Sequence, residues 1–332
     1  MNNSPTNNSM NTQSNAVPES SLGSPAIAPP AVSANRDMYW SIRRELWENR
    51  SIYVAPLAVA AVYLLGFWIS LIGLPHSIRE LAAHDLAHQR VMLAMPYAHA
   101  AMLLIATAFL VGVFYSLDAL HGERRDRSIL FWKSLPVSDR TTVLSKAAIP
   151  LVVLPLLTFA IIVVLQVIML LLSSAVLLMS GLNVATLWTR LPFLQMELVL
   201  LYSLVALALW HAPIYAWLLL VSGWARRATF LWAVFPPLAI SIFQSIAFHI
   251  FDNIGFHTSY FGSLLKDRVF GFAAEAFAFT MPDGTPLDAH LIPLTQLTPG
   301  RFLTSPGLWV GLAFAAAFLA AAVRMRRYRE PI

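Results

Sequence analysis

The chain has 332 residues, of which 58% are hydrophobic and only 12% are charged. Soluble domains carry about 25% charged residues, so this composition excludes an ordinary soluble protein and indicates an integral membrane protein. The absence of cysteine excludes disulfides, thiolate metal sites and cysteine nucleophiles. The net charge of +5 does not point to nucleic acid, because most Lys and Arg residues stand beside apolar runs, where they are typical of membrane topology signals.

The N-terminal part divides into a polar tail and an amphipathic segment. Residues 1–36 are rich in Asn, Ser and Pro and show no periodicity, which predicts a disordered tail ahead of one membrane domain at residues 37–332. Within that domain, residues 37–50 alternate Trp, Tyr, Ile and Leu with Arg and Glu. The pattern predicts a helix lying on the cytoplasmic membrane surface. An ordinary extension of the first span is the alternative.

Six stretches are long and apolar enough to cross a bilayer core of roughly 30 Å, which needs about 20 residues. We therefore predict an all-α integral membrane protein with spans at residues 54–74, 98–117, 147–175, 197–221, 229–250 and 306–323. Basic residues concentrate in the segments on the same side as residue 37, and the loop at 118–146 holds many of them. Both termini are therefore expected in the cytoplasm, with the long connection at 251–305 outside.

The first external loop carries a histidine pattern. His76, Glu80, His84 and His88 recur every four residues and would form one stripe on a helix. His84 and His88 make an H-x-x-x-H pair that could bind zinc. Asp85, directly after His84, stands where the metalloprotease motif H-E-x-x-H has Glu. A membrane-embedded metal-dependent hydrolase is thus one alternative function. A solvated helix face is the simpler interpretation, because no third ligand is evident.

The cytoplasmic loop at 118–146 is charged in its first half and apolar in its second. Eight formal charges between Glu123 and Arg140 would cost on the order of 20–28 kcal/mol at the bilayer centre, so this loop cannot insert. Its apolar part, from Ile129 to Leu135, predicts a surface that a partner covers. We expect Ser138 or Asp139 to cap the helix of the third span and Lys146 to reach the membrane surface.

At these residues the chain resembles the permease subunits of type 2 ABC transporters, chiefly bacterial exporters. The matching positions are Glu123, Arg124, Ser128, Leu130, Leu135, Pro136, Val137, Ser138 and Lys146. The resemblance implies a coupling helix that docks on a cytoplasmic ABC ATPase. The coupling residues it implies are Glu123, Arg124, Arg125, Asp126, Arg127, Ile129, Leu130, Trp132, Leu135 and Pro136. Many relatives carry Gly where this chain has Arg127, so the start of the helix is expected to be shifted.

The chain contains no G-x-x-x-x-G-K-[ST] phosphate loop. We therefore expect that the chain is not an enzyme and binds no cofactor itself. ATP and Mg²⁺ are expected to bind to the partner ATPase. Six spans resemble half a transporter, which implies a second permease copy or paralogue in the bacterial plasma membrane, in contact with lipid. A non-transporting membrane scaffold or receptor is a further alternative.

Polar residues inside the predicted spans are candidates for a translocation path, because buried polar groups in membrane helices are costly. The candidates are Gln166, His211, Ser241, Gln244, Ser245 and His249. Hydrogen bonds that only hold helices together are an equal alternative. Prolines at 150, 155, 213, 236 and 237 are expected to kink their helices.

Overall fold

The computed structural model describes residues 34–81, 83–126, 138–251, 260–271 and 297–328. Over these residues the chain is helical and contains no β-strand. The helices are α1 (Ala34–Glu48), α2 (Ser51–Ser70), α3 (Leu74–Leu81), α4 (Leu86–Asp118), α5 (His121–Arg125), α7 (Asp139–Ala148), α8 (Leu154–Met179), α9 (Ala185–Arg190), α10 (Phe193–Trp224), α11 (Thr229–Phe251), α12 (Tyr260–Phe270), α14 (Pro299–Thr304) and α15 (Pro306–Tyr328).

Six helical segments among the described residues are long and apolar enough to cross a membrane, which confirms the predicted number of spans. They are α2, α4 with α5, α7 with α8, α10, α11 and α15. The boundaries differ most at α4, which begins at Leu86 rather than at residue 98. Continuing an existing helix adds one hydrogen bond for each residue fixed, so α4 extends past its apolar stretch into polar sequence.

The third span contains the clearest proline effect. A π-helical segment at Ile149–Val153 joins α7 to α8, with Pro150 inside it and Pro155 directly after it. Proline has no N–H and its ring collides with the carbonyl four residues earlier, so a wider turn accommodates it. The structure thus has an irregular turn at Pro150, one of the positions where a kink is predicted. By contrast, Pro213 lies inside α10, and Pro236 and Pro237 inside α11, with helix continuing on both sides.

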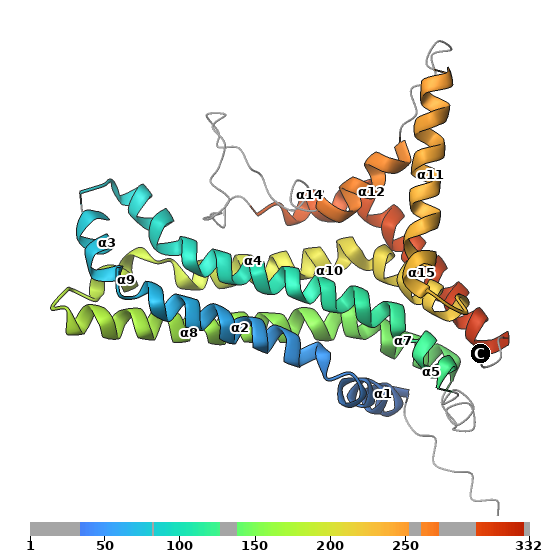
Figure 1. Cartoon of the computed structure of the whole chain (residues 1–332), viewed down its shortest axis with the longest axis horizontal. Coiled ribbons are helices and arrows are strands. Elements are labelled where there is room, and N and C mark those ends of the chain that lie inside the picture. Colours follow the sequence, from blue (N-terminus) through green and yellow to red (C-terminus); the bar gives the residue numbers. More distant parts are fainter. Residues whose placement is uncertain (1–33, 82, 127–137, 252–259, 272–296, 329–332) are drawn as a thin grey trace, which may run out of the picture.

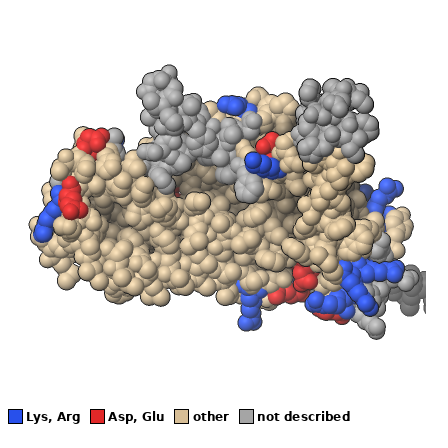
Figure 2. Space-filling model, turned by 45° about the horizontal axis from the view of Figure 1, so that its top comes forward, with Lys and Arg blue, Asp and Glu red and all other residues tan. Residues whose placement is uncertain are grey.

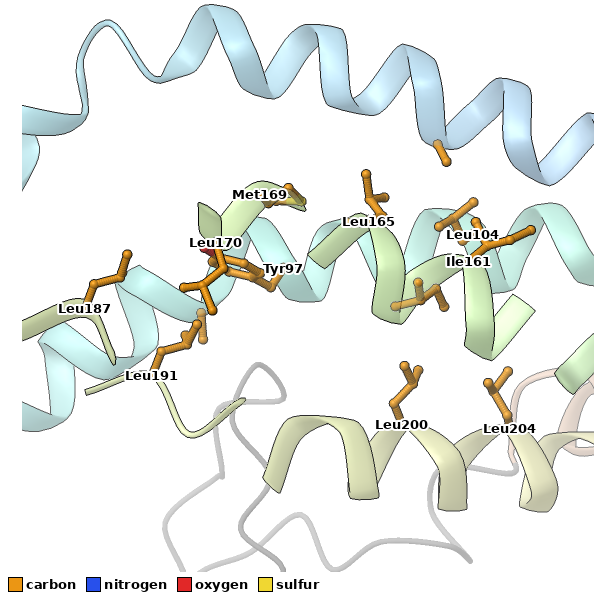
Figure 3. Packing of buried hydrophobic residues seen from close by; sticks show 14 of the residues in the cluster. Tyr97, Leu104, Ile161, Leu165, Met169, Leu170, Leu187, Leu191, Leu200 and Leu204 are labelled. Atoms are coloured by element: carbon orange, nitrogen blue, oxygen red, sulfur yellow. The ribbon is translucent and has the colours of Figure 1, made fainter. Parts of the chain in front are cut away.

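The largest hydrophobic cluster lies where α4, α8 and α10 meet, with α2 packed against them. Figure 3 shows Leu165 of α8 near Leu104 of α4, with Leu200 and Leu204 of α10 pointing toward them from the other side. Leu104 and Leu165 are almost fully buried. This apolar contact holds the four long helices side by side in one bundle (Figure 1).

Two long helices, α11 and α15, lie outside this group of four. α11 stands away from the long helices at a steep angle (Figure 1), and most of its apolar side chains are exposed. α15 packs along α10 and ends beside α5 and α7. In a membrane, the exposed surface of α11 is suited to contact with lipid or with another apolar helix.

α12, which lies in the predicted outer connection, packs onto α10 and α15. The Trp210 Nε1 donates to the carbonyl of Asp267 at 3.1 Å, and the guanidinium of Arg268 lies 4.3 Å from the centroid of the Trp210 ring. Arg268 also donates to the carbonyl of Gly307 at 2.5 Å. Gly311 leaves space for this side chain, because a Cβ at that position would overlap the guanidinium of Arg268.

Candidate functional site: a buried charge cluster

Charged side chains from helices far apart in sequence meet at one end of the bundle, beside α1, α5 and the end of α15 (Figure 1). The charge cluster consists of Arg44, Glu45, Glu123, Asp139, Lys146 and Arg326, together with the hydroxyl of Tyr115. Three of these residues are formally positive and three are negative, so the cluster is formally neutral. Charges removed from water need such pairing.

Glu45 is at the centre of the cluster and is fully buried. Its Oε1 accepts hydrogen bonds from Arg44 Nη2 and from Lys146 Nζ, both at 2.8 Å. Its Oε2 accepts from the hydroxyl of Tyr115 at 2.8 Å. The carboxylate therefore joins α1 to α7 and to α4.

Glu123 is the second buried carboxylate of the cluster. Its Oε1 lies 3.1 Å from Arg44 Nη2 and 3.1 Å from Lys146 Nζ, and its Oε2 accepts from Arg326 Nη1. The Nε of Arg326 donates in turn to Asp139 Oδ1 at 3.1 Å. The last helix, α15, is thus joined to both ends of the loop between α5 and α7.

The surroundings of the cluster strengthen these contacts. Ile52, Val143 and Leu120 are buried near it, and a low dielectric increases the attraction between opposite charges. Burial disfavours the charged form of Arg44, but the carboxylates of Glu45, Glu48 and Glu123 outweigh burial and raise the pKa of Arg44. Arg44 therefore remains positive at every physiological pH.

Local sequence positions the two ends of the loop. Ser138 caps α7, accepting from the backbone N–H of Thr141 at 3.1 Å, as predicted. Lys146 stands two turns further along α7 and is 2% exposed. The expectation that Lys146 reaches the membrane surface is therefore wrong, because two buried carboxylates hold its ammonium inside the protein.

A second set of contacts joins the first end of the loop to the end of α10. Arg124 Nη1 donates to the carbonyl of Gly223 at 2.9 Å and to that of Ala225 at 3.2 Å. The hydroxyl of Ser222 accepts from the backbone N–H groups of Leu120 and His121, each at 2.9 Å. The final carbonyls of a helix lack partners within the helix, so Arg124 completes the end of α10.

The predicted coupling residues divide into buried, exposed and undescribed positions. Glu123 and Arg124 are buried within this chain, so little of either side chain is left for a partner. Arg125 and Asp126 are exposed and pair with each other at 3.1 Å. Arg127, Ile129, Leu130, Trp132, Leu135 and Pro136 lie outside the described residues. The docking role of this loop thus stays a prediction.

The predicted path residues whose side chains the structure describes lie on three helices, α8, α10 and α11. Gln166 is buried and its Nε2 donates to the carbonyl of Tyr97 on α4 at 3.1 Å. His211 is also buried, with Nδ1 3.0 Å from the carbonyl of Leu207 and Nε2 3.2 Å from that of Val269. These contacts are of the kind that hold helices together.

The remaining path candidates lie on α11, away from Gln166 and His211. Ser241 and Gln244 are partly exposed and Ser245 is exposed. The hydroxyl of Ser241 donates to the carbonyl of Pro237. For His249 the structure describes the backbone but not the side chain. A shared polar path through these residues stays a prediction.

The histidine pattern does not form one continuous helix. α3 ends at Leu81 and α4 begins at Leu86, so His84 lies between the helices. The exposed rings of His84 and His88 are 4.8 Å apart, and His76 pairs with Glu80 at 3.1 Å. Among the described residues, no three His, Cys, Asp or Glu side chains form a metal-binding group.

Glu45, Tyr115 and Arg326 are members of the charge cluster that the sequence reasoning missed. One signal was present for Glu45, which stands three residues after Ile42 and beside Leu46, two residues that pack in a hydrophobic cluster. Residues three apart share a helix face, so Glu45 lies on the buried side of α1. A charged residue on an apolar helix face indicates a buried partner.

Comparison with known proteins gives no relative. No protein-family model matches the chain, and neither a curated protein nor a solved structure matches it. The class of protein therefore rests on the structure itself. The described part of the chain is helical, and its six long apolar helices are those of a multi-pass membrane protein.

Proposed function

We propose that this chain is the membrane-spanning permease subunit of an ABC transporter of the exporter kind. Two copies, or one copy and a paralogue, would form the membrane part. A separate cytoplasmic ATPase would bind ATP and Mg²⁺, since the chain has no phosphate loop of its own. The loop from residue 118 to 146 would receive the movement of that ATPase.

The observation that carries this proposal is the way the loop is fixed at both ends. Glu123 joins its beginning to α1 and α15, and Asp139 and Lys146 join its end to the same two helices. Arg124 adds α10. A force on the loop would therefore pass into several spans at once, because buried ion pairs resist separation.

The charge distribution supports placing this end of the bundle in the cytoplasm of a bacterium. Lys and Arg gather at the end where α1 and the last turns of α15 lie (Figure 2). On α1, Trp40 and Trp47 are exposed, and the guanidinium of Arg43 lies 5.2 and 4.9 Å from their ring centroids. Exposed Trp and Arg together suit a helix at the surface of the plasma membrane.

Co-expression with ABC ATPases encoded beside the gene tests the proposal. We expect one such ATPase to copurify with the full-length chain in a one-to-one ratio. Arg125→Glu, which reverses an exposed charge at the start of the loop, is expected to weaken this association at least about fivefold, since several contacts share the interface. Trp132→Asp should do the same through the apolar half of the loop.

Arg79→Glu is the matched control, because Arg79 lies on α3 at the opposite end of the bundle (Figure 1). It should leave ATPase association unchanged. If none of the encoded ATPases binds the wild-type chain, the transporter proposal fails. If Arg125→Glu and Trp132→Asp both copurify with the ATPase at wild-type levels, the loop is not its docking element.

A further inference from the structure

A carboxylate lies inside the bundle and belongs to none of the contacts described above. Glu197, in the second turn of α10, is 9% exposed. Neither of its carboxylate oxygens has a hydrogen-bond partner among the residues that the structure describes. An ionisable residue inside a membrane-spanning helix is costly, so such residues are commonly retained for binding or transport.

The position of Glu197 on α10 shows which way it faces. Glu197, Leu200 and Leu204 are buried and stand three and four residues apart, so they share one face of the helix. Leu200 and Leu204 belong to the hydrophobic cluster between α4, α8 and α10 (Figure 3). The carboxylate of Glu197 therefore faces the interior of this bundle.

Two further polar oxygens lie in that interior, on side chains that are each 2% exposed. The Oε1 of Gln166 on α8 lacks a hydrogen-bond partner among the described residues. The hydroxyl of Tyr97 on α4 interacts with that of Ser173. Tyr97 and Gln166 are adjacent, because Gln166 Nε2 donates to the carbonyl of Tyr97. With Glu197, the interior presents a carboxyl group and two further oxygens that can accept hydrogen bonds.

This set of groups suits an organic cation better than a metal ion. Ca²⁺ takes six to eight oxygen ligands and Mg²⁺ keeps an octahedral shell, whereas one carboxylate and two neutral oxygens fall short. The walls are instead apolar and aromatic, with Met169, Leu170 and the Tyr97 ring in the same cluster. Aromatic faces and a carboxylate together attract large, weakly hydrated cations.

A groove of about 820 Å³ between α2 and α4 gives such a ligand an approach from the membrane. It is lined mainly by apolar side chains, together with Tyr63, Ser70 and His99. Phe67 on its wall packs against Tyr97, with ring centroids 6.5 Å apart. The groove thus adjoins the aromatic pair next to the interior oxygens.

We propose that Glu197, with Tyr97 and Gln166, forms a binding site for lipophilic organic cations inside the bundle. This inference names the substrate class of the proposed transporter, and in that sense rests on the proposed function. Glu197 supplies the charge that selects a cation. The groove between α2 and α4 accommodates apolar parts of the ligand as it enters from the bilayer.

The test is equilibrium binding of tetraphenylphosphonium to the full-length chain in lipid nanodiscs, without any ATPase. Wild type should bind this cation saturably and bind tetraphenylborate, an anion of the same shape, much more weakly. Glu197→Gln should weaken tetraphenylphosphonium binding at least about tenfold, since a charged contact is lost. Glu197→Asp, which keeps the charge, should retain most of the affinity.

Glu80→Gln is the matched control, because Glu80 is exposed on α3 and paired with His76. It should bind the cation as wild type does. Glu197→Gln keeps the shape of the side chain and breaks no hydrogen bond within the described residues, so no loss of folding is expected, and size-exclusion profiles check this. Should that variant aggregate, Tyr97→Phe carries the test, with an expected loss of about threefold or more.

The inference is overturned if wild type binds no tetraphenylphosphonium saturably, if it binds the anion equally well, or if the folded test variant binds the cation with wild-type affinity. ATPase association is measured separately and without a cation. Loss of cation selectivity together with intact ATPase association would therefore reject this binding site alone. Cation-selective binding without any ATPase association would reject the transporter proposal and leave a cation-binding membrane protein.

Discussion

The ammonium of Lys146 donates to the carboxylate of Glu45 across 2.8 Å, and the two side chains are 2% and 0% exposed. Removing one partner takes away one of the few ion pairs of the other and leaves the buried cluster with an unbalanced charge. We expect Glu45→Gln to lower the free energy of unfolding by about 3–5 kcal/mol. Equilibrium unfolding in detergent, followed by circular dichroism, measures this loss. Lys146→Met should cost a similar amount.

Glu48→Gln is the matched control on the same helix. Glu48 is roughly half exposed, and burial raises its pKa although Arg44 opposes this. A carboxyl whose folded pKa is raised favours folding only at pH below its unfolded pKa, and it loses that contribution as pH rises through the folded value. At pH 7 Glu48→Gln should therefore be neutral or slightly stabilising. A loss equal to that of Glu45→Gln would contradict a special role for the buried pair.

The local features of this chain could be predicted from sequence, and the long-range ones could not. The number of spans follows from runs of apolar residues, and the Ser138 cap follows from its place before Asp139 and the third span. The pairing of Glu45 with Lys146 joins residues that are 101 positions apart. No periodicity or motif connects such residues, because the packing of α1 against α7 decides the contact.

Glu197 shows a different limit. Its position in an apolar stretch is visible in the sequence, yet the polar residues predicted to line a path there are Gln166 and His211, not Glu197. Whether a carboxylate near the end of a span is buried depends on how neighbouring helices pack around it. Only the structure shows that Glu197 is buried and faces the same interior as Leu200 and Leu204.

Arg124 and Arg125 are neighbours with opposite surroundings, and this allows a matched comparison. Arg124 is 5% exposed and completes the end of α10 through Gly223 and Ala225. Arg124→Met is expected to cost about 1.5–3 kcal/mol of stability, because hydrogen bonds from a charged donor are lost. Arg125→Met, at an exposed position, should leave stability almost unchanged, because solvent screens its pairing with Asp126. Equal losses in the two unfolding curves would argue against the role of Arg124.

The position of Gly311 has no room for a larger side chain, because the guanidinium of Arg268 occupies the space beside it. Gly311→Ala should displace Arg268 from Trp210 and Gly307, at a cost of about 1–3 kcal/mol from overpacking and lost cation–π contact. Arg268→Ala should also destabilise. In the double variant, the added methyl fills space that the guanidinium has left. The double variant should therefore lose less stability than the sum of the losses in the two single variants. Strict additivity in thermal unfolding would show that the two sites do not touch.

The chain contains no cysteine, so single introduced cysteines report the topology of the six spans without background labelling. Arg125→Cys, Arg227→Cys and Tyr328→Cys lie at exposed positions on the side that we place in the cytoplasm. Glu80→Cys and Arg301→Cys lie in segments that we place on the opposite side. In intact cells, a membrane-impermeant maleimide should label only the last two, and all five should react after the membrane is opened. This pattern follows because basic residues in short loops stay on the cytoplasmic side. Labelling of the first three in intact cells would reverse the orientation and place the charge cluster, with its loop, out of reach of any cytoplasmic ATPase.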